Sequence, residues 1–223
     1  MAVEALRNFG GIQSPERTKE YLDISAAELQ RLSLLVDKVL KLSVFENKEI
    51  ELKKEWFDCK QLVEEVINTM KLQFEKTNAQ VRFETEGKKF LIEADKLHIS
   101  SVIYNLLDNA LKYSKEDPQI DVCLRSKAEH IELSVTDNGI GIANEYKEKI
   151  FNKFFRVPSG DHHNTKGYGL GLSYVSNIAK RHQGFITVET ELSKGSKFTV
   201  YLPYKESEVI DYGAGRKIIK KSF

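Results

Sequence analysis

The chain has 223 residues, of which 41% are hydrophobic and 30% are charged, the balance of a globular protein rather than a disordered or membrane-spanning one. Its formal net charge of +1 gives no general attraction to nucleic acid or to a lipid surface, so we expect no nucleic-acid partner. The two cysteines, Cys59 and Cys123, form neither a metal-binding spacing nor a disulfide framework.

Residues 1–46 predict an antiparallel helical hairpin. Ser14 is suited to cap a helix whose first residue is Pro15. The apolar stripe that runs from Leu22 to Leu40 is wide for a helix that packs on a single partner. We therefore expect two copies of the hairpin to form a four-helix bundle, which makes the protein a homodimer.

Residues 47–204 combine strand and helix patterns. Alternating apolar residues predict strands, and apolar residues at helical spacing predict helices. The predicted strands are 50–57, 81–84, 90–93, 120–124, 131–135, 185–191 and 197–202, and the predicted helices are 61–74, 97–113 and 169–182. Antiparallel strands with segregated helices indicate an α+β fold, a two-layer sandwich in which helices cover one face of one sheet. Residues 205–223 have no clear period and predict a C-terminal tail.

Polar residues recur on one face of the predicted helix 97–113. Asn105, Asn109 and Lys112 share this face because residues three and four apart are neighbours on a helix. Amide oxygens suit a hydrated Mg²⁺ ion, and lysine supplies a point charge for phosphate. Taken alone, the pattern also fits a solvated polar face, although asparagine is a mediocre helix former.

A carboxylate and two glycines follow the predicted strand 131–135. Asp137 stands just beyond the strand end, and Gly139 and Gly141 let a ligand lie against the backbone. The exocyclic amine of adenine is a suitable donor to such a carboxylate. As a bare pattern, Asp-Asn-Gly is also a common turn signal.

Glycines also open the predicted helix 169–182. The segment from Lys166 to Leu172 reads Lys-Gly-Tyr-Gly-Leu-Gly-Leu. Glycines allow the backbone to approach a phosphate, and the first N–H groups of a helix bind anions. The pattern is weak by itself. The sequence contains neither a Rossmann unit around these glycines nor a Gly-Lys-Ser/Thr phosphate loop.

In this order and at these separations, the segments resemble the catalytic domain of bacterial sensor histidine kinases. That domain has the Bergerat ATP-binding fold, shared with Hsp90, MutL and DNA gyrase. The resemblance rests on residues 105–113, 137–141, 151–156, 167–172 and the closing strand 195–203. Residues 1–46 resemble most of the family's dimerisation and histidine-phosphotransfer hairpin.

The resemblance implies ATP and Mg²⁺ as ligands and assigns a role to each matching residue. Asn109, assisted by Asn105, would coordinate Mg²⁺, Lys112 would contact phosphate, and these three would be the catalytic residues. Tyr113 would lie against the nucleotide, and Asp137 would accept the adenine amine. The other implied nucleotide-binding residues are Gly139, Gly141, Ile142, Phe155, Arg156, Lys166, Gly167, Tyr168, Gly169, Leu170, Gly171 and Leu172. Residues 157–166 would form a mobile lid over the phosphates.

The implied reaction is transfer of the ATP γ-phosphoryl group to a histidine, followed by relay to an aspartate in the receiver domain of a response regulator. The family's acceptor histidine lies in a His-Glu or His-Asp motif on the first hairpin helix, and none of the five histidines here fits. We therefore expect a truncated chain that binds ATP without phosphorylating itself. It would be the cytoplasmic domain of a parent protein anchored in the bacterial inner membrane.

Two other functions fit parts of the same pattern. One is an ATPase of the gyrase–MutL (GHKL) type, which uses a glutamate to activate water. The corresponding position here is Asn105, and this predicts poor hydrolysis. The other is a non-catalytic dimerisation module whose nucleotide pocket serves only for regulation.

Overall fold

The computed structural model describes residues 18–19, 21–26, 28–29, 51–114, 116–158 and 168–203. The chain divides into two units, Met1–Ile50 and Glu51–Phe223. The described residues of the first unit are helical. The rest of the predicted hairpin and the predicted tail lie outside the described residues. Within the described part of the chain, no helix is both long and apolar enough to cross a bilayer.

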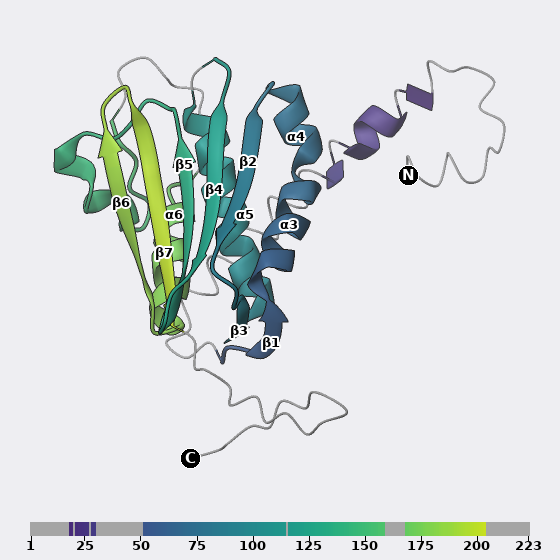
Figure 1. Ribbon diagram of the computed structural model, residues 1–223. Coiled ribbons are helices and arrows are strands. Elements are labelled where there is room, and N and C mark those ends of the chain that lie inside the picture. Colours follow the sequence, from purple (N-terminus) through teal and green to yellow (C-terminus); the bar gives the residue numbers. More distant parts are fainter. Residues whose placement is uncertain are drawn as a thin grey trace. The chain divides into compact units, whose positions relative to one another are not determined.

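A five-stranded sheet forms one layer of the second unit (Figure 1). Its strands, in spatial order, are β2 (Gln80–Glu86), β4 (Gln119–Ser126), β5 (His130–Asp137), β7 (Gly195–Pro203) and β6 (Phe185–Glu191). Three of the four strand pairs are antiparallel as predicted, but β2 and β4 run parallel. A parallel pair needs a long crossover connection, and here helix α5 (Lys96–Tyr113) lies in that connection.

A second, two-stranded sheet pairs β1 (Glu55–Asp58) with β3 (Leu91–Ala94). It corrects two predictions, that of a single sheet and that of a strand over residues 50–57. Glu51–Lys54 have no strand pairing. The strand ends at Asp58 because its carboxylate accepts the Lys60 N–H at 2.8 Å and so begins the next helix.

The helical layer contains α3 (Cys59–Thr69), α4 (Lys71–Lys76), α5 and α6 (Gly171–Arg181), with two short 3-10 turns, η1 (Asn144–Tyr146) and η2 (Lys149–Phe151). The single helix predicted over residues 61–74 is wrong, because it breaks at Met70. The Met70 N–H bonds to both Val66 O and Ile67 O, which tightens the last turn of α3. The side chain of Met70 is fully buried and anchors the break in the core.

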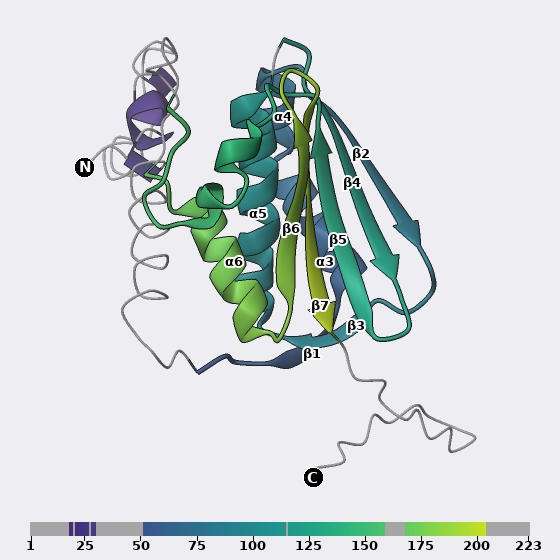
Figure 2. The same ribbon diagram turned by 90° about the vertical axis from the view of Figure 1, so that its left-hand side faces the viewer.

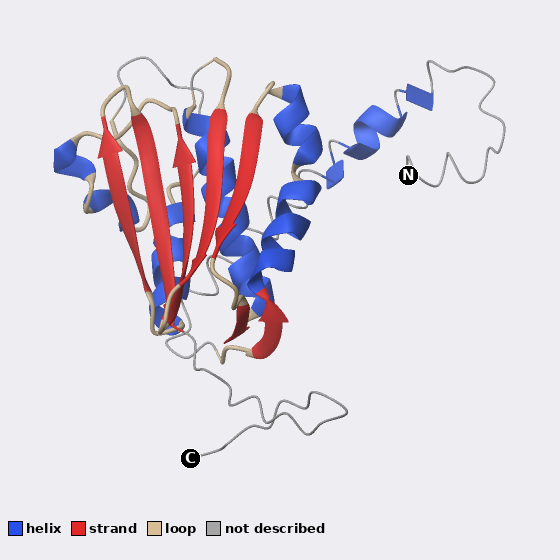
Figure 3. Ribbon diagram, viewed as in Figure 1, coloured by secondary structure: helices blue, strands red, loops and turns tan. Residues whose placement is uncertain are grey.

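The helices cover one face of the five-stranded sheet, which confirms the predicted two-layer α+β fold (Figures 2 and 3). The core lies between the layers, where β4, β5 and β7 each direct alternate apolar residues toward the helices. These buried residues are Ile120, Val122, Leu124, Ile131, Leu133, Val135, Phe198, Val200 and Leu202. Helices α5 and α6 pack against each other. The start of α6 lies beside the middle of α5, and the residue after α6 bonds to the residue before α5. The candidate site lies where α6 starts, and the bond between His182 and Asp95 lies at the opposite end of the helix pair.

Candidate functional site

Asp137, the last residue of β5, is buried and holds two backbone hydrogen bonds on one oxygen. Its Oδ1 accepts the Gly139 N–H at 2.8 Å and the Ser196 N–H at 3.3 Å. Its Oδ2 accepts no hydrogen bond from any residue that the structure describes. Burial raises the pKa of the Asp137 carboxyl, and the two N–H donors lower it in part. The site thus has a carboxylate that is fixed through one oxygen and can accept an N–H group of a ligand with the other.

The turn after Asp137 joins the end of β5 to the end of α5. The Ile140 N–H donates to the Tyr113 carbonyl at 3.0 Å, and Gly139 lies so close to that carbonyl that a Cβ would collide with it. Gly141 lies against the backbone of Glu191. These contacts bring the predicted residues Tyr113, Gly139 and Gly141 together with Asp137. The side chain of Tyr113 stays largely exposed.

Two hydroxyl residues that the sequence did not single out complete this region. Thr190 Oγ1 accepts the Ile142 N–H at 2.9 Å and lies 2.9 Å from Ser196 Oγ. The Ser196 N–H is the second donor to Asp137. The only signal for Ser196 in the sequence is its place in the closing-strand motif, and Thr190 has none. Their role follows from strand pairing, which places the start of β7 beside the end of β5 and the end of β6 beside the start of β7.

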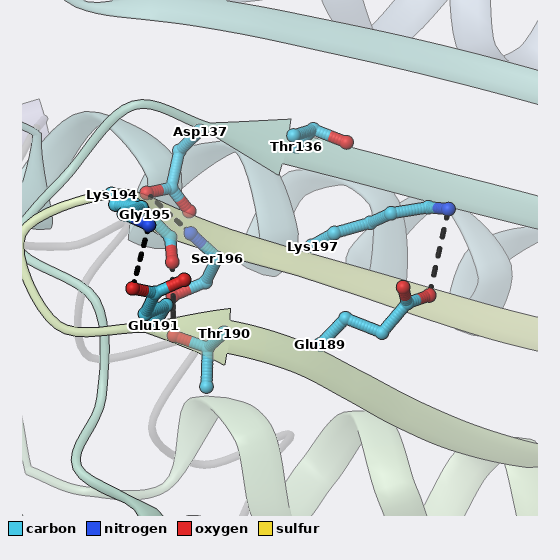
Figure 4. A pocket seen from close by; sticks show the side chains of 9 residues that line it. All are labelled: Thr136, Asp137, Glu189, Thr190, Glu191, Lys194, Gly195, Ser196 and Lys197. Carbon is cyan, nitrogen blue, oxygen red and sulfur yellow. Dashed lines mark hydrogen bonds and ion pairs between the residues drawn. The ribbon is translucent and has the colours of Figure 1, made fainter.

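An open recess of about 330 Å³ lies at the ends of β5, β6 and β7, with Asp137 in its wall (Figure 4). Its rim carries two ion pairs, Lys194–Glu191 at 2.7 Å and Lys197–Glu189 at 3.5 Å. The amide residues of α5 do not line this recess. It therefore adjoins the carboxylate end of the candidate site and does not contain the whole site.

The two asparagines of α5 face the start of α6. The Asn105 Nδ2 donates to the Ser101 carbonyl at 2.6 Å, which directs its Oδ1 toward Gly171. A Cβ on Gly171 would lie 3.1 Å from that oxygen and within 4 Å of the Asn109 amide. The Asn109 side chain has no hydrogen-bond partner in the described part of the chain. Two amide oxygens beside a residue without a side chain are a donor set that fits a hydrated Mg²⁺ ion.

Lys112 is half-exposed and paired, one turn further along α5. Its Nζ contacts the Asp108 carboxylate. The sequence predicted the shared face of Asn105, Asn109 and Lys112, but not that Asp108 holds the lysine. A phosphate would have to displace this carboxylate, a modest cost because exposed i,i+4 pairs contribute only about 0.3–0.5 kcal/mol.

Phe154 and Gly169, which come from two of the predicted motifs, meet just before α6. Gly169 has a φ of +70°, which favours glycine, and its carbonyl accepts the Phe154 N–H at 3.0 Å. The Phe155 ring packs at a tilt against the Tyr146 ring, with ring centroids 5.9 Å apart. Leu170 is buried, Leu172 is half-buried, and Arg156 and Tyr168 are exposed. Lys166, Gly167 and most of the predicted lid lie outside the described residues.

This fold and site define the Bergerat class of nucleotide-binding domain: a helical layer with amides on α5, a carboxylate at a strand end, and a glycine turn before α6. Residues 94–206 match the family model of "Histidine kinase-, DNA gyrase B-, and HSP90-like ATPase". The chain belongs to this family, and the matched range contains every predicted site residue.

The similar proteins are sensor kinases. The sensor protein RprX of Bacteroides fragilis is 38% identical over 210 residues, which are 93% of this chain and 40% of the relative. The chain thus spans well under half of that protein. The catalytic domain of histidine kinase ThkA is 30% identical with a TM-score of 0.61, over 69% of this chain and 99% of that chain. Histidine kinase ThkA in complex with response regulator protein TrrA is 28% identical with a TM-score of 0.64, over 93% of this chain and 59% of that chain.

Proposed function

We propose that this chain binds ATP with Mg²⁺ and forms the catalytic part of a protein-histidine kinase, which transfers the γ-phosphoryl group to a histidine for relay to a receiver-domain aspartate. The observation that carries the proposal is the largely buried carboxylate of Asp137, whose Oδ1 holds both backbone donors and whose Oδ2 accepts no hydrogen bond in the described part of the chain. The family match, the sensor-kinase relatives and the ThkA–TrrA complex support the reaction and the response regulator partner.

Asp137 would select the base. The ionised carboxylate only accepts hydrogen bonds, so it suits the exocyclic amine of adenine. Guanine has a carbonyl oxygen at the corresponding place, and two acceptors facing each other in a buried site are unfavourable. The backbone N–H groups of Gly139 and Ser196 hold the carboxylate in place before any ligand arrives. We therefore expect strong discrimination between adenine and guanine nucleotides.

The phosphate groups would lie between α5 and the start of α6. Asn105 and Asn109 would hold Mg²⁺, which when bound would neutralise phosphate oxygens and orient the terminal phosphate. The free N–H groups at the start of α6 would face the same oxygens, and Lys112 would leave Asp108 for a phosphate. These groups position and neutralise the phosphate, and the nucleophile would come from a histidine elsewhere.

A thermal melt tests the binding proposal. Excess ADP and Mg²⁺, at about 100 times the dissociation constant, should stabilise the chain by about 2.7 kcal/mol, which raises the melting temperature by several degrees. GDP should give a much smaller shift, and Asp137→Ala should remove the ADP shift. A folded parent chain that shows no shift with ADP would contradict the proposal.

A labelling experiment tests the reaction. None of the five histidines precedes an acidic residue, so γ-labelled ATP should leave no stable, acid-labile label on this chain alone. Such a label should appear on a histidine-containing hairpin of a homologous kinase that is added as substrate. Phosphate release at steady state should stay low, because the Asn105 amide cannot act as a general base. Rapid phosphate release with no transfer would support the ATPase function instead.

A further inference from the structure

A buried hydrogen-bond network lies at the end of the helix pair opposite to the candidate nucleotide site. Asp95 caps α5: its Oδ1 accepts the His98 N–H at 3.0 Å, and its Oδ2 accepts the Lys53 N–H at 2.9 Å. The Asp95 N–H donates to His182 Nε2 at 3.0 Å, so the other ring nitrogen carries the proton and donates to the Ile178 carbonyl at 2.9 Å. His182 thereby ties the end of α6 to the start of α5.

A second bond joins the two helices nearer to the nucleotide site. His98 Nδ1 lies 2.8 Å from the Tyr174 hydroxyl, and the two rings are 6.1 Å apart. The Tyr174 side chain is almost fully buried. Tyr174 stands only three residues after Gly171, whose Cα faces the amides of Asn105 and Asn109. The network therefore reaches from the far end of the helix pair to within one turn of the amide pair.

The start of α6 depends on such contacts because its own cap is weak. Leu170, the N-cap residue, forms no side-chain capping bond. A capping side chain normally holds the first turn of a helix, and its loss leaves the position of that turn to tertiary contacts. The adenine end of the site is built differently, since the donors to Asp137 come from its own turn and from β7.

We propose that Asp95, His98, Tyr174 and His182 form a positioning clamp that holds the start of α6 at the correct distance from the amides of α5. The clamp governs how tightly the phosphate groups of a nucleotide bind and leaves the binding of the adenosine part unchanged. The inference rests on the proposed function, because it assigns the phosphate groups to the space between α5 and α6.

The test compares two ligands on one variant by calorimetry. Tyr174→Phe removes only the hydroxyl that bonds His98. Its affinity for Mg·ATP should fall about five- to tenfold, the loss expected for one hydrogen bond, while its affinity for adenosine stays that of the parent. Tyr201→Phe is the matched control: Tyr201 lies in the sheet, against the rings of His130 and Phe185. This control should bind both ligands like the parent.

Each result separates the clamp from the proposed function. Equal losses of affinity for adenosine and Mg·ATP in Tyr174→Phe would overturn the clamp, because they would indicate a general structural defect. Unchanged affinity for both ligands would also overturn it. A parent chain that binds neither ligand would contradict the proposed function itself. If Tyr174→Phe does not fold, His98→Gln tests the same bond from the other helix and should give the same selective loss.

Discussion

The two ends of the α5–α6 pair each hold a buried aspartate, and the two carboxylates are used in opposite ways. Asp95 and Asp137 are both less than 10% exposed. At Asp95 each oxygen accepts a backbone N–H, one from Lys53 and one from His98. At Asp137 both backbone donors bond to Oδ1. Burial alone therefore does not distinguish a structural carboxylate from one that can bind a ligand. The two are distinguished by whether one carboxylate oxygen has no hydrogen bond within the protein.

The comparison predicts the largest stability loss at Asp95. Asp95→Ala removes the cap of α5 and leaves two backbone donors without an acceptor, so the free energy of unfolding should fall by about 2–3 kcal/mol in urea denaturation. Asp58→Ala is the matched control, since Asp58 caps α3 through residues of its own first turn, and it should cost only about 1 kcal/mol. Equal losses would show that the additional bond from the carboxylate to the Lys53 N–H adds nothing.

Asp137→Asn should affect binding and spare the fold. The asparagine oxygen can still accept the Gly139 and Ser196 donors, but its amide group would face the adenine amine, donor against donor. Adenosine affinity should fall about 10- to 100-fold, the range for a lost hydrogen bond to a charged group. The urea midpoint should not decrease, because the cost of burying the charge is removed. Asp121→Asn, on the exposed face of β4, should change neither quantity.

The raised pKa of Asp137 predicts a pH dependence of adenosine binding. The ionised form is the better acceptor, so affinity should fall as the pH drops through a value above the ordinary 3.8. The stability of the protein without ligand depends on pH in the opposite direction. An acid whose folded pKa is raised stabilises the fold below its unfolded pKa and loses that contribution as the pH rises through the folded pKa. Calorimetric titration from pH 7.5 downward, with Asp137→Asn as a reference without this titration, checks the prediction.

The smallest expected effect is a pH dependence of stability at His182. Burial lowers its pKa, the positive charge of Lys54 lowers it further, and the Ile178 carbonyl and Asp95 oppose these effects. The unfolded chain therefore takes up the proton first, near pH 6.5, and the free energy of unfolding should fall as the pH drops below that value. Urea denaturation at pH 7.5 and 5.5 should show a smaller decrease in His182→Gln than in the parent. An identical decrease would mean that His182 contributes none of it.

Much of the fold could be predicted because it depends on local periodicity. The helix predicted over residues 97–113 is Lys96–Tyr113, and the strands predicted over 120–124 and 131–135 bury the predicted apolar residues. The break at Met70 was missed because a buried methionine does not interrupt helical spacing. The parallel pairing of β2 with β4 was missed because pairing partners depend on topology.

The candidate site also contains features that the sequence predicted and features that it did not. The sequence predicted Asn105, Asn109 and Asp137, and the structure brings the first two to the start of α6 and the third to the turn beside Tyr113. It did not predict the pairing of Lys112 with Asp108. The helix predicted over residues 169–182 is Gly171–Arg181, but the sequence did not predict that His182, the next residue, accepts the Asp95 N–H.

By itself, the sequence determined the two-layer class, the order of the motifs and the family, because these depend on residues that are neighbours along the chain. Only the tertiary structure decided that both oxygens of Asp95 accept hydrogen bonds, whereas at Asp137 only Oδ1 does among the described residues. One of the two donors to Asp137 Oδ1 comes from a residue 59 positions away, and the donor to Asp95 Oδ2 comes from a residue 42 positions away. Bonds over such separations form only when packed layers bring distant segments together, and no local pattern records them.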